Sequence, residues 1–261
     1  MFKKFFLLSA MALIFFSCKE DKVTTSTPDV LIEKLVDSTE IIVVEPNNGD
    51  ELNAILVEKI DSISFSKIKD SVRPPRKMLK KITDFKKVKK LLHGTVEFDD
   101  SEQYGEAPAV KTINFKNGTK FNDKNGFYEA YFVAYFPTEE ILLCEGGHST
   151  DVSFDLKNGK LTEDTGNPNE MVSSPKSTVR LSSHYGGQEC SAYFIQKKKN
   201  KEFEKIIQLD DEFKKITGHW LCTVGEAFWA DEKTLYVSET NNAGETQKLV
   251  TLYFKISLIK K

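Results

Sequence analysis

The stretch FPTEEILL at residues 136–143 carries the pattern that decides the fold of the second half of the chain. A polar turn leads into an apolar run, and after a loop a second short run, VSFDL at 152–156, brings in an aromatic residue. Short apolar runs that are bounded by turn residues are typical of β-strands. The stretch therefore predicts two consecutive strands.

The same unit occurs twice more. SPKSTVRL at 174–181 is followed by YFI at 193–195, and WADEKTLYV at 229–237 is followed by YFKI at 253–256. The units begin about 38 and about 55 residues apart, a spacing that suits propeller blades with insertions. In this respect the C-terminal half, residues 128–259, resembles β-propeller-like repeats. Because three units are too few to close a ring, a β-sandwich or an open antiparallel meander fits the pattern as well.

Shorter signals complete the expected fold. Asn-Gly pairs at 117–118 and 158–159 predict hairpin turns, with type I′ geometry at the first. Apolar runs at 31–36, 41–44 and 52–60 predict a helix or strand followed by a hairpin. We therefore expect a mainly β fold with one amphipathic helix, arranged as an antiparallel meander, propeller-like or sandwich domain.

The one helix is expected between Met78 and Leu92, where apolar residues recur at helical spacing before Gly94. Its outer face is rich in lysine: Lys77, Lys80, Lys81, Lys86, Lys87, Lys89 and Lys90. Such a face could contact anionic lipid. Acidic residues at 97–106 follow directly, so a solvated face with balanced charge is the simpler interpretation.

The first 17 residues predict a cleaved signal peptide. Lys3 and Lys4 give a positive start, and the apolar run 5–16 is too short to span a membrane but has the length of a signal-peptide core. Ser17 places a small residue directly before Cys18. This arrangement resembles the lipobox of bacterial lipoproteins, which implies that Cys18 becomes the acylated mature N-terminus.

The residues around Cys18 resemble those of Bacteroidota lipoproteins in particular. Phe15 and Phe16 depart from the usual lipobox, as in the looser form of that group. Lys19, Glu20 and Asp21 resemble the signal that exports such lipoproteins to the cell surface. The resemblance implies a palmitate-type anchor in the cell outer membrane and exposure at the surface, with a periplasm-facing anchor as the alternative.

Composition bounds the rest of the chain. Residues 18–29 are expected to form the lipidated tether, 30–127 a mixed α/β region and 128–261 the β-rich region, and 30–261 could be a single domain. Removal of Lys3 and Lys4 with the signal reduces the 37 basic residues to 35, against 39 acidic ones. A negative balance argues against nucleic-acid binding, which depends on the neutralisation of phosphates.

Three cysteines remain once Cys18 is acylated: Cys144, Cys190 and Cys222. An oxidising compartment favours disulfides, so either one disulfide with one buried thiol or three buried thiols would account for them. Their spacing shows no metal-binding or CxxC pattern, and we expect neither a metal nor another cofactor.

Two glycine-rich loops, CEGGHSTD at 144–151 and SSHYGGQEC at 182–190, hold the candidate site. They occupy similar places in the first two units, so they could lie side by side. Their polar residues would then form a ligand, metal or acid–base cluster, made of His148, Asp151, His184 and Glu189. Paired glycines are also what a bulged strand connection needs for structural reasons alone.

These observations favour a binding or interaction module that hangs from a lipid anchor and presents loops to a protein or glycan. The chain has no HExxH, GxSxG, phosphate-loop or dinucleotide motif, so an enzyme is the weaker hypothesis. If the protein were an enzyme, we would expect a hydrolase whose active site is built on the loops of His148 and His184. An inhibitor or immunity-type lipoprotein would have the same sequence features and is the other alternative.

Overall fold

A computed structural model of the 261-residue chain describes residues 53–72, 78–99, 107–123, 129–187, 190–243 and 248–260. All of these belong to one compact unit, Thr39–Lys261. The predicted signal, Cys18, the triplet Lys19-Glu20-Asp21 and the tether lie outside the described residues. The described part is mainly β with antiparallel sheets, which confirms the expected fold class.

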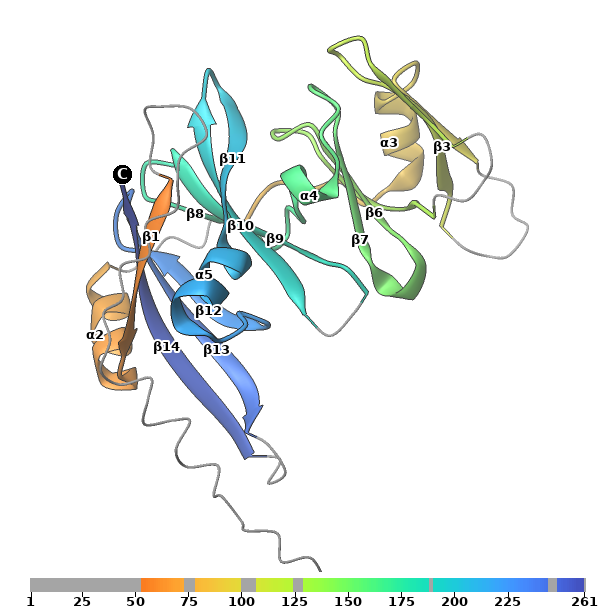
Figure 1. Cartoon of the computed structure of the whole chain (residues 1–261). Helices are drawn as coiled ribbons and strands as arrows, with labels where there is room; N and C mark the ends of the chain where they lie inside the picture. The colour runs from red at the N-terminus through yellow and green to blue at the C-terminus, as the bar shows by residue number, and fades with distance from the viewer. Residues whose placement is uncertain are drawn as a thin grey trace, which may run out of the picture. The chain divides into compact units, whose positions relative to one another are not determined.

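The strands form three sheets, which we number in chain order (Figure 1). Sheet I has the order β2 (Val96–Asp99), β3 (Ala109–Asn114), β5 (Tyr131–Phe136), β6 (Ile141–Glu145) and β7 (Asp151–Asp155), with β4 (Lys120–Asn122) paired to β3. Sheet II has the order β11 (Glu202–Gln208), β10 (Ser191–Lys199), β9 (Val179–Tyr185) and β8 (Val172–Ser173). Sheet III has the order β1 (Ala54–Ile60), β14 (Lys248–Ile259), β13 (Thr234–Ala243) and β12 (Val224–Trp229).

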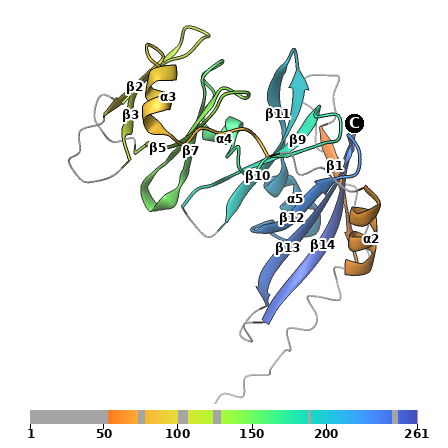
Figure 2. The ribbon, with the colours of Figure 1, turned by 180° about the vertical axis from the view of Figure 1, so that it is seen from behind.

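Each of the three sequence units supplies two neighbouring strands to a different sheet. The unit that begins at residue 136 forms β6 and β7, the unit at 174 forms β9 and β10, and the unit at 229 forms β13 and β14. The early strand β1 then pairs antiparallel with β14, from Ala54 opposite Ile259 to Ile60 opposite Tyr253. Figure 1 and Figure 2 both show β1 lying along β14. The other arm of the expected hairpin, at 41–44, lies outside the described residues.

Two main cores hold the sheets. Sheets II and III share one buried cluster with helix α5 (Leu209–Thr217), in which Ile195, Phe213 and Trp229 are almost fully buried. Sheet I has its own cluster with helix α3 (Phe85–Leu91), centred on Val88 and Phe154. Helix α2 (Ser62–Val72) packs Phe65 against Phe228 and Tyr236 of sheet III.

The helix expected from Met78 begins only at Phe85. The Asp84 side chain accepts a hydrogen bond from the Lys87 N–H at 3.1 Å and so caps the helix there. Before the cap, the N–H and C=O of Ile82 bond to Tyr135 of β5 at 2.8 and 2.9 Å. Because this bridge uses the backbone of Ile82, the helix cannot extend back to Met78, which is 85% exposed. Helices α2, α5 and the short α4 (Thr162–Thr165) add to the single helix that the sequence predicted.

The two Asn-Gly turns have different outcomes. The first joins β3 to β4 as a hairpin, but Gly118 (φ 87°) is the only residue of the pair with positive φ, so the turn is not type I′. At the second, the Asp155 N–H donates to the Lys160 carbonyl at 2.9 Å and closes a turn around Gly159. The chain then enters α4 instead of a second strand. Among the described residues, no helix is both long and apolar enough to cross a membrane.

Candidate functional site

A cleft of about 410 Å³ lies where strands of all three sheets approach one another. Asp151 enters it from the start of β7, Ser183 and Tyr185 from β9, and Tyr193 from β10. The start of β12 and the connection before β8 complete the wall with Thr223, Val224, Gly225, Ala227, Asn167 and Glu170. This volume falls within the range of small-molecule sites, and polar groups converge on it from separate elements.

Asp151 is held in a fixed position between sheets I and II. Its Oδ1 accepts a hydrogen bond from Asn167 Nδ2, and its Oδ2 accepts one from the Tyr185 backbone N–H, both at 2.8 Å. Nearby, a Cβ placed on Gly187 would lie only 2.5 Å from Cγ2 of Thr150. The two glycine-rich loops therefore lie in direct contact, in the arrangement that their places in the sequence units suggested.

The structure separates the three predicted cluster residues that it describes. Asp151 lines the cleft, whereas His148 is exposed in a 3₁₀ turn, η1 (Gly147–Ser149), with a φ of 57°. Glu189 lies outside the described residues. Within the part of the chain that is described, no three His, Cys, Asp or Glu side chains are placed to hold a metal ion.

His184 sits on the opposite face of β9 from the cleft residues Ser183 and Tyr185, because side chains alternate along a strand. Its ring lies 6.2 Å from that of Phe194, and its Nδ1 is buried without a hydrogen-bond partner. Burial lowers the pKa of His184 below its usual value. A neutral imidazole is therefore the favoured form in the folded protein.

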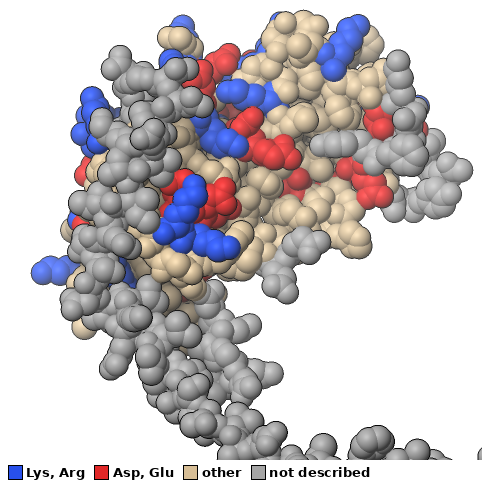
Figure 3. Space-filling model, viewed as in Figure 1, with Lys and Arg blue, Asp and Glu red and all other residues tan. Residues whose placement is uncertain are grey.

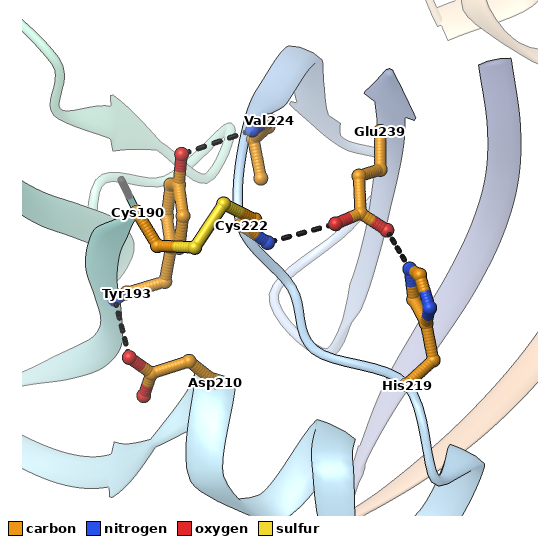
Figure 4. Close-up of a disulfide and its surroundings, with 7 residues drawn as sticks. All are labelled: Cys190, Tyr193, Asp210, His219, Cys222, Val224 and Glu239. Atoms are coloured by element: carbon orange, nitrogen blue, oxygen red, sulfur yellow. Dashed lines mark hydrogen bonds and ion pairs between the residues drawn. A yellow bond between two sulfur atoms is a disulfide. The ribbon is translucent and has the colours of Figure 1, made fainter. Parts of the chain in front are cut away.

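A disulfide between Cys190 and Cys222 joins sheet II to the segment that leads into β12 (Figure 4). Cys144 is a free, buried thiol whose pKa is raised by desolvation. Of the two alternatives for the cysteines, the structure thus has one disulfide and one buried thiol. Next to the bridge, the Val224 N–H donates to the Tyr193 hydroxyl at 2.9 Å, which fixes one wall of the cleft.

A second support for this wall was not predicted from the sequence. The carboxylate of Glu239, on β13, is fully buried and accepts a hydrogen bond from the Cys222 N–H at 2.7 Å. Its other oxygen contacts Nε2 of His219 at 2.6 Å (Figure 4). Glu239 is far from both partners in the sequence, so only the sheet brings the three together.

A larger groove of about 1330 Å³ adjoins the cleft. Its lining is a mixture of polar and apolar residues, and the apolar part includes Met78, Leu79 and Met171, with the buried rings of Phe136 and Trp229. The groove and the cleft have four lining residues in common: Glu170, Val172, Gly225 and Ala227. The two hollows therefore meet at β8 and β12.

The charged side chains that line the cleft are all acidic. They belong to Asp151 and Glu170, and the described lining residues include no Lys, Arg or His. On the molecular face shown in Figure 3, by contrast, basic and acidic side chains are interspersed. The two acidic side chains therefore give the cleft a negative charge of its own.

Two groups of polar contacts connect the sheets around the cleft. Arg180, only 5% exposed, donates from Nη1 to Glu139 at 2.9 Å and from Nε to Gln196 at 2.6 Å, which links sheet II to sheet I. Glu232 of the β12–β13 turn accepts hydrogen bonds from the Ser174 and Thr178 hydroxyls and from the Lys176 N–H, which links sheet III to sheet II.

No family model matches the chain, and comparisons with curated proteins and with solved structures give no match.

Proposed function

We propose that this protein is a lipid-anchored lipoprotein of the outer membrane that acts as a binding module, with the cleft between the three sheets as its ligand site. The observation that carries the binding function is the convergence of polar groups from three sheets on one hollow. Hydrogen bonds from Asn167, Tyr185 and Val224 hold those groups in place, and such preorganisation lowers the entropic cost of binding.

Features of the sequence support the proposed location at the outer membrane. Residues 1–17 have the length and charge of a signal peptide, Ser17-Cys18 resembles a lipobox, and Lys19-Glu20-Asp21 resembles a surface-export signal. The Cys190–Cys222 disulfide agrees with an oxidising compartment. Attachment through more than one acyl chain would make the anchor firm, since one chain alone binds a membrane reversibly.

Asp151 favours binding over catalysis. Both of its oxygens accept hydrogen bonds, one of them from a backbone N–H, so the side chain is held in one position as part of a preorganised site. The cleft takes a small molecule or a single projecting group of a larger partner. Neither His148 nor His184, the residues of the hydrolase hypothesis, lines it.

A blocked cleft tests the binding function. Thr223 is an exposed lining residue, so Thr223→Trp fills the cleft without disturbing the core. Thr138→Trp, on an exposed turn outside the cleft, is the matched control. The protein would be purified from membranes and its bound small molecules extracted and identified by mass spectrometry. We expect a ligand in the wild type and in Thr138→Trp that is lost in Thr223→Trp; an identical profile in all three would overturn the proposal.

The proposed location and lipid anchor are tested separately. Protease treatment of intact cells should degrade the wild type, and replacement of Lys19, Glu20 and Asp21 by alanine should protect it. Cys18→Ser should abolish labelling by palmitate and release the chain from the membrane fraction. A wild-type chain that survives protease on intact cells would overturn surface exposure but leave the anchor itself in place.

A further inference from the structure

We infer that the cleft and the groove form one binding site for an elongated amphiphile with an amine or ammonium head, in which the head occupies the cleft and the alkyl chain lies along the groove. This inference rests on the proposed binding function and specifies the chemical class of its ligand.

The two hollows are continuous. Val172, Gly225 and Ala227 belong to both walls, and Glu170 stands at the boundary. The Glu170 N–H donates to the Asn167 carbonyl at 3.0 Å, and the side chain of the same Asn167 holds Asp151. The turn at 167–170 thus holds the Asp151 carboxylate inside the cleft through Asn167. It also places the exposed carboxylate of Glu170 where the cleft opens into the groove.

The cleft favours a positive head. Each oxygen of Asp151 accepts one hydrogen bond and keeps a second lone pair for a ligand. No Lys or Arg among the described lining residues neutralises the negative charge of Asp151 and Glu170. Tyr185 and Tyr193 add aromatic rings, whose faces attract ammonium groups. A carboxylate or phosphate head would instead meet two like charges.

The groove favours an alkyl chain. Met78, Leu79, Met171 and Ala227 contribute apolar side chains to its lining, together with the buried ring of Trp229. Methionine side chains adapt to irregular apolar partners. The 85% exposure of Met78 leaves apolar surface that such a chain would remove from water.

The two lysines among the described lining residues of the groove, Lys69 and Lys81, already have hydrogen-bond partners. Lys69 Nζ contacts both oxygens of Glu226 at 2.7 and 2.9 Å, and Lys81 Nζ donates to Asn169 Oδ1 at 2.9 Å. An acidic amphiphile that entered with its head at this end would have to compete for them. Because Lys81 bonds to a neutral amide and keeps its charge, the preference for a positive head rests on Asp151 and Glu170 in the cleft.

Calorimetry with defined probes tests the inference. The protein would be the complete mature chain from residue 18 with Cys18→Ser, so that no detergent is needed. The probes would be dodecyltrimethylammonium below its micelle concentration, octyltrimethylammonium, choline and dodecanoate. We expect dodecyltrimethylammonium to bind about tenfold or more tightly than dodecanoate, which has a chain of similar length. Each CH₂ between the octyl and dodecyl probes should add about fourfold in affinity, so choline, which has no alkyl chain, should bind far more weakly than either.

Paired variants assign the two halves of the site. Glu170→Gln should weaken dodecyltrimethylammonium about tenfold, whereas Glu145→Gln, an exposed acid outside both hollows, should not. Met78→Ser should reduce the gain per CH₂, whereas Ile63→Ser, which is 79% exposed and also outside both hollows, should leave it unchanged.

The outcomes separate this inference from the function on which it rests. Equal affinity for dodecanoate would overturn the head group, and equal affinity for choline would overturn the role of the groove. If no ammonium probe binds but Thr223→Trp still removes an extracted ligand of another class, the amphiphile is wrong and the binding function stands. If Thr223→Trp removes nothing, the binding function itself fails.

Discussion

Oε2 of Glu239 lies 2.6 Å from Nε2 of His219, and this contact ties β13 to the segment that leads into the cleft. The other oxygen of the same buried carboxylate accepts the Cys222 N–H, so one side chain fixes both the backbone of the disulfide and the imidazole beside it. A charge without exposure to water is stable only when its partners stay in place. The wall of the cleft therefore depends on Glu239.

Glu239→Ala should strongly destabilise the protein. The substitution removes the buried carboxylate that both the Cys222 N–H and the His219 ring contact, and loss of such a group costs about 2–4 kcal/mol at a buried site. Glu239→Gln keeps an acceptor for Cys222 and should cost less. Urea denaturation measures both, with Glu226→Ala as the control, because Glu226 pairs with Lys69 at the surface. A Glu239→Ala variant no less stable than Glu226→Ala would refute the role of the pair.

The disulfide should contribute about as much to the stability of the fold as the buried Glu239 carboxylate does. Cys190→Ser together with Cys222→Ser removes the covalent link between sheet II and the segment that leads into β12, and a loss of about 2–4 kcal/mol is typical for such a crosslink. Peptide mapping without reductant should recover a joined Cys190–Cys222 pair, while Cys144 should react with alkylating reagents only after unfolding. Rapid alkylation of Cys144 in the native protein would contradict its burial.

The strands of the repeated units could be predicted from the sequence because their signal is local. Turn residues and short apolar runs lie within a few positions of one another, and Ile141–Glu145, Val179–Tyr185 and Thr234–Ala243 are strands as expected. The start of α3 was wrong for an equally local reason, since Asp84 caps the helix while Ile82 bonds to Tyr135. The period of the apolar residues cannot show which of two competing hydrogen-bond partners the backbone chooses.

Pairing across the chain could not be predicted in the same way. Glu58 and Lys255 are in contact although they are 197 positions apart, and no feature of either strand in the sequence indicates that the two strands pair. The same limit applies to the site. Asp151 was found because it ends a glycine-rich loop, but Asn167, Glu170 and Tyr193 become neighbours of Asp151 only where three sheets meet. Each of them looks like an ordinary turn or strand residue in the sequence.

His184 should make stability depend on pH. Burial lowers its folded pKa, against the opposing effect of Glu163, Asp151 and Asp210 and with a contribution from Lys205 in the same direction. As pH falls below about 6.5, the unfolded chain takes up a proton that the folded chain does not, so the stability present above that pH is progressively lost.

Urea midpoints at about pH 7.5 and about pH 5.5 measure this effect. His184→Gln should reduce the difference between the two midpoints, because it removes the group that titrates differently in the two states. His93→Gln is the control, since His93 is exposed. The same pH dependence in wild type and His184→Gln would show that burial of this imidazole does not govern acid stability.

Two neighbouring glycines test the contact between the glycine-rich loops. Gly187 has a φ of 78°, and an added Cβ would lie 2.5 Å from Thr150 Cγ2, so Gly187→Ala strains the backbone and also pushes the loops apart. We expect a loss of about 1–3 kcal/mol and weaker ligand retention, because the Tyr185 N–H that holds Asp151 lies two residues away.

Gly186 is the matched control. A Cβ on Gly186 would meet nothing within 4 Å and its φ is not positive, so Gly186→Ala should leave stability nearly unchanged or raise it slightly by restricting the unfolded chain. Thermal denaturation of the two variants, with the extraction assay on each, separates a specific contact from general loop sensitivity. If both substitutions have the same effect, the two loops do not depend on Gly187 for their contact, and the position of Asp151 is set by its bonds to Asn167 and Tyr185 alone.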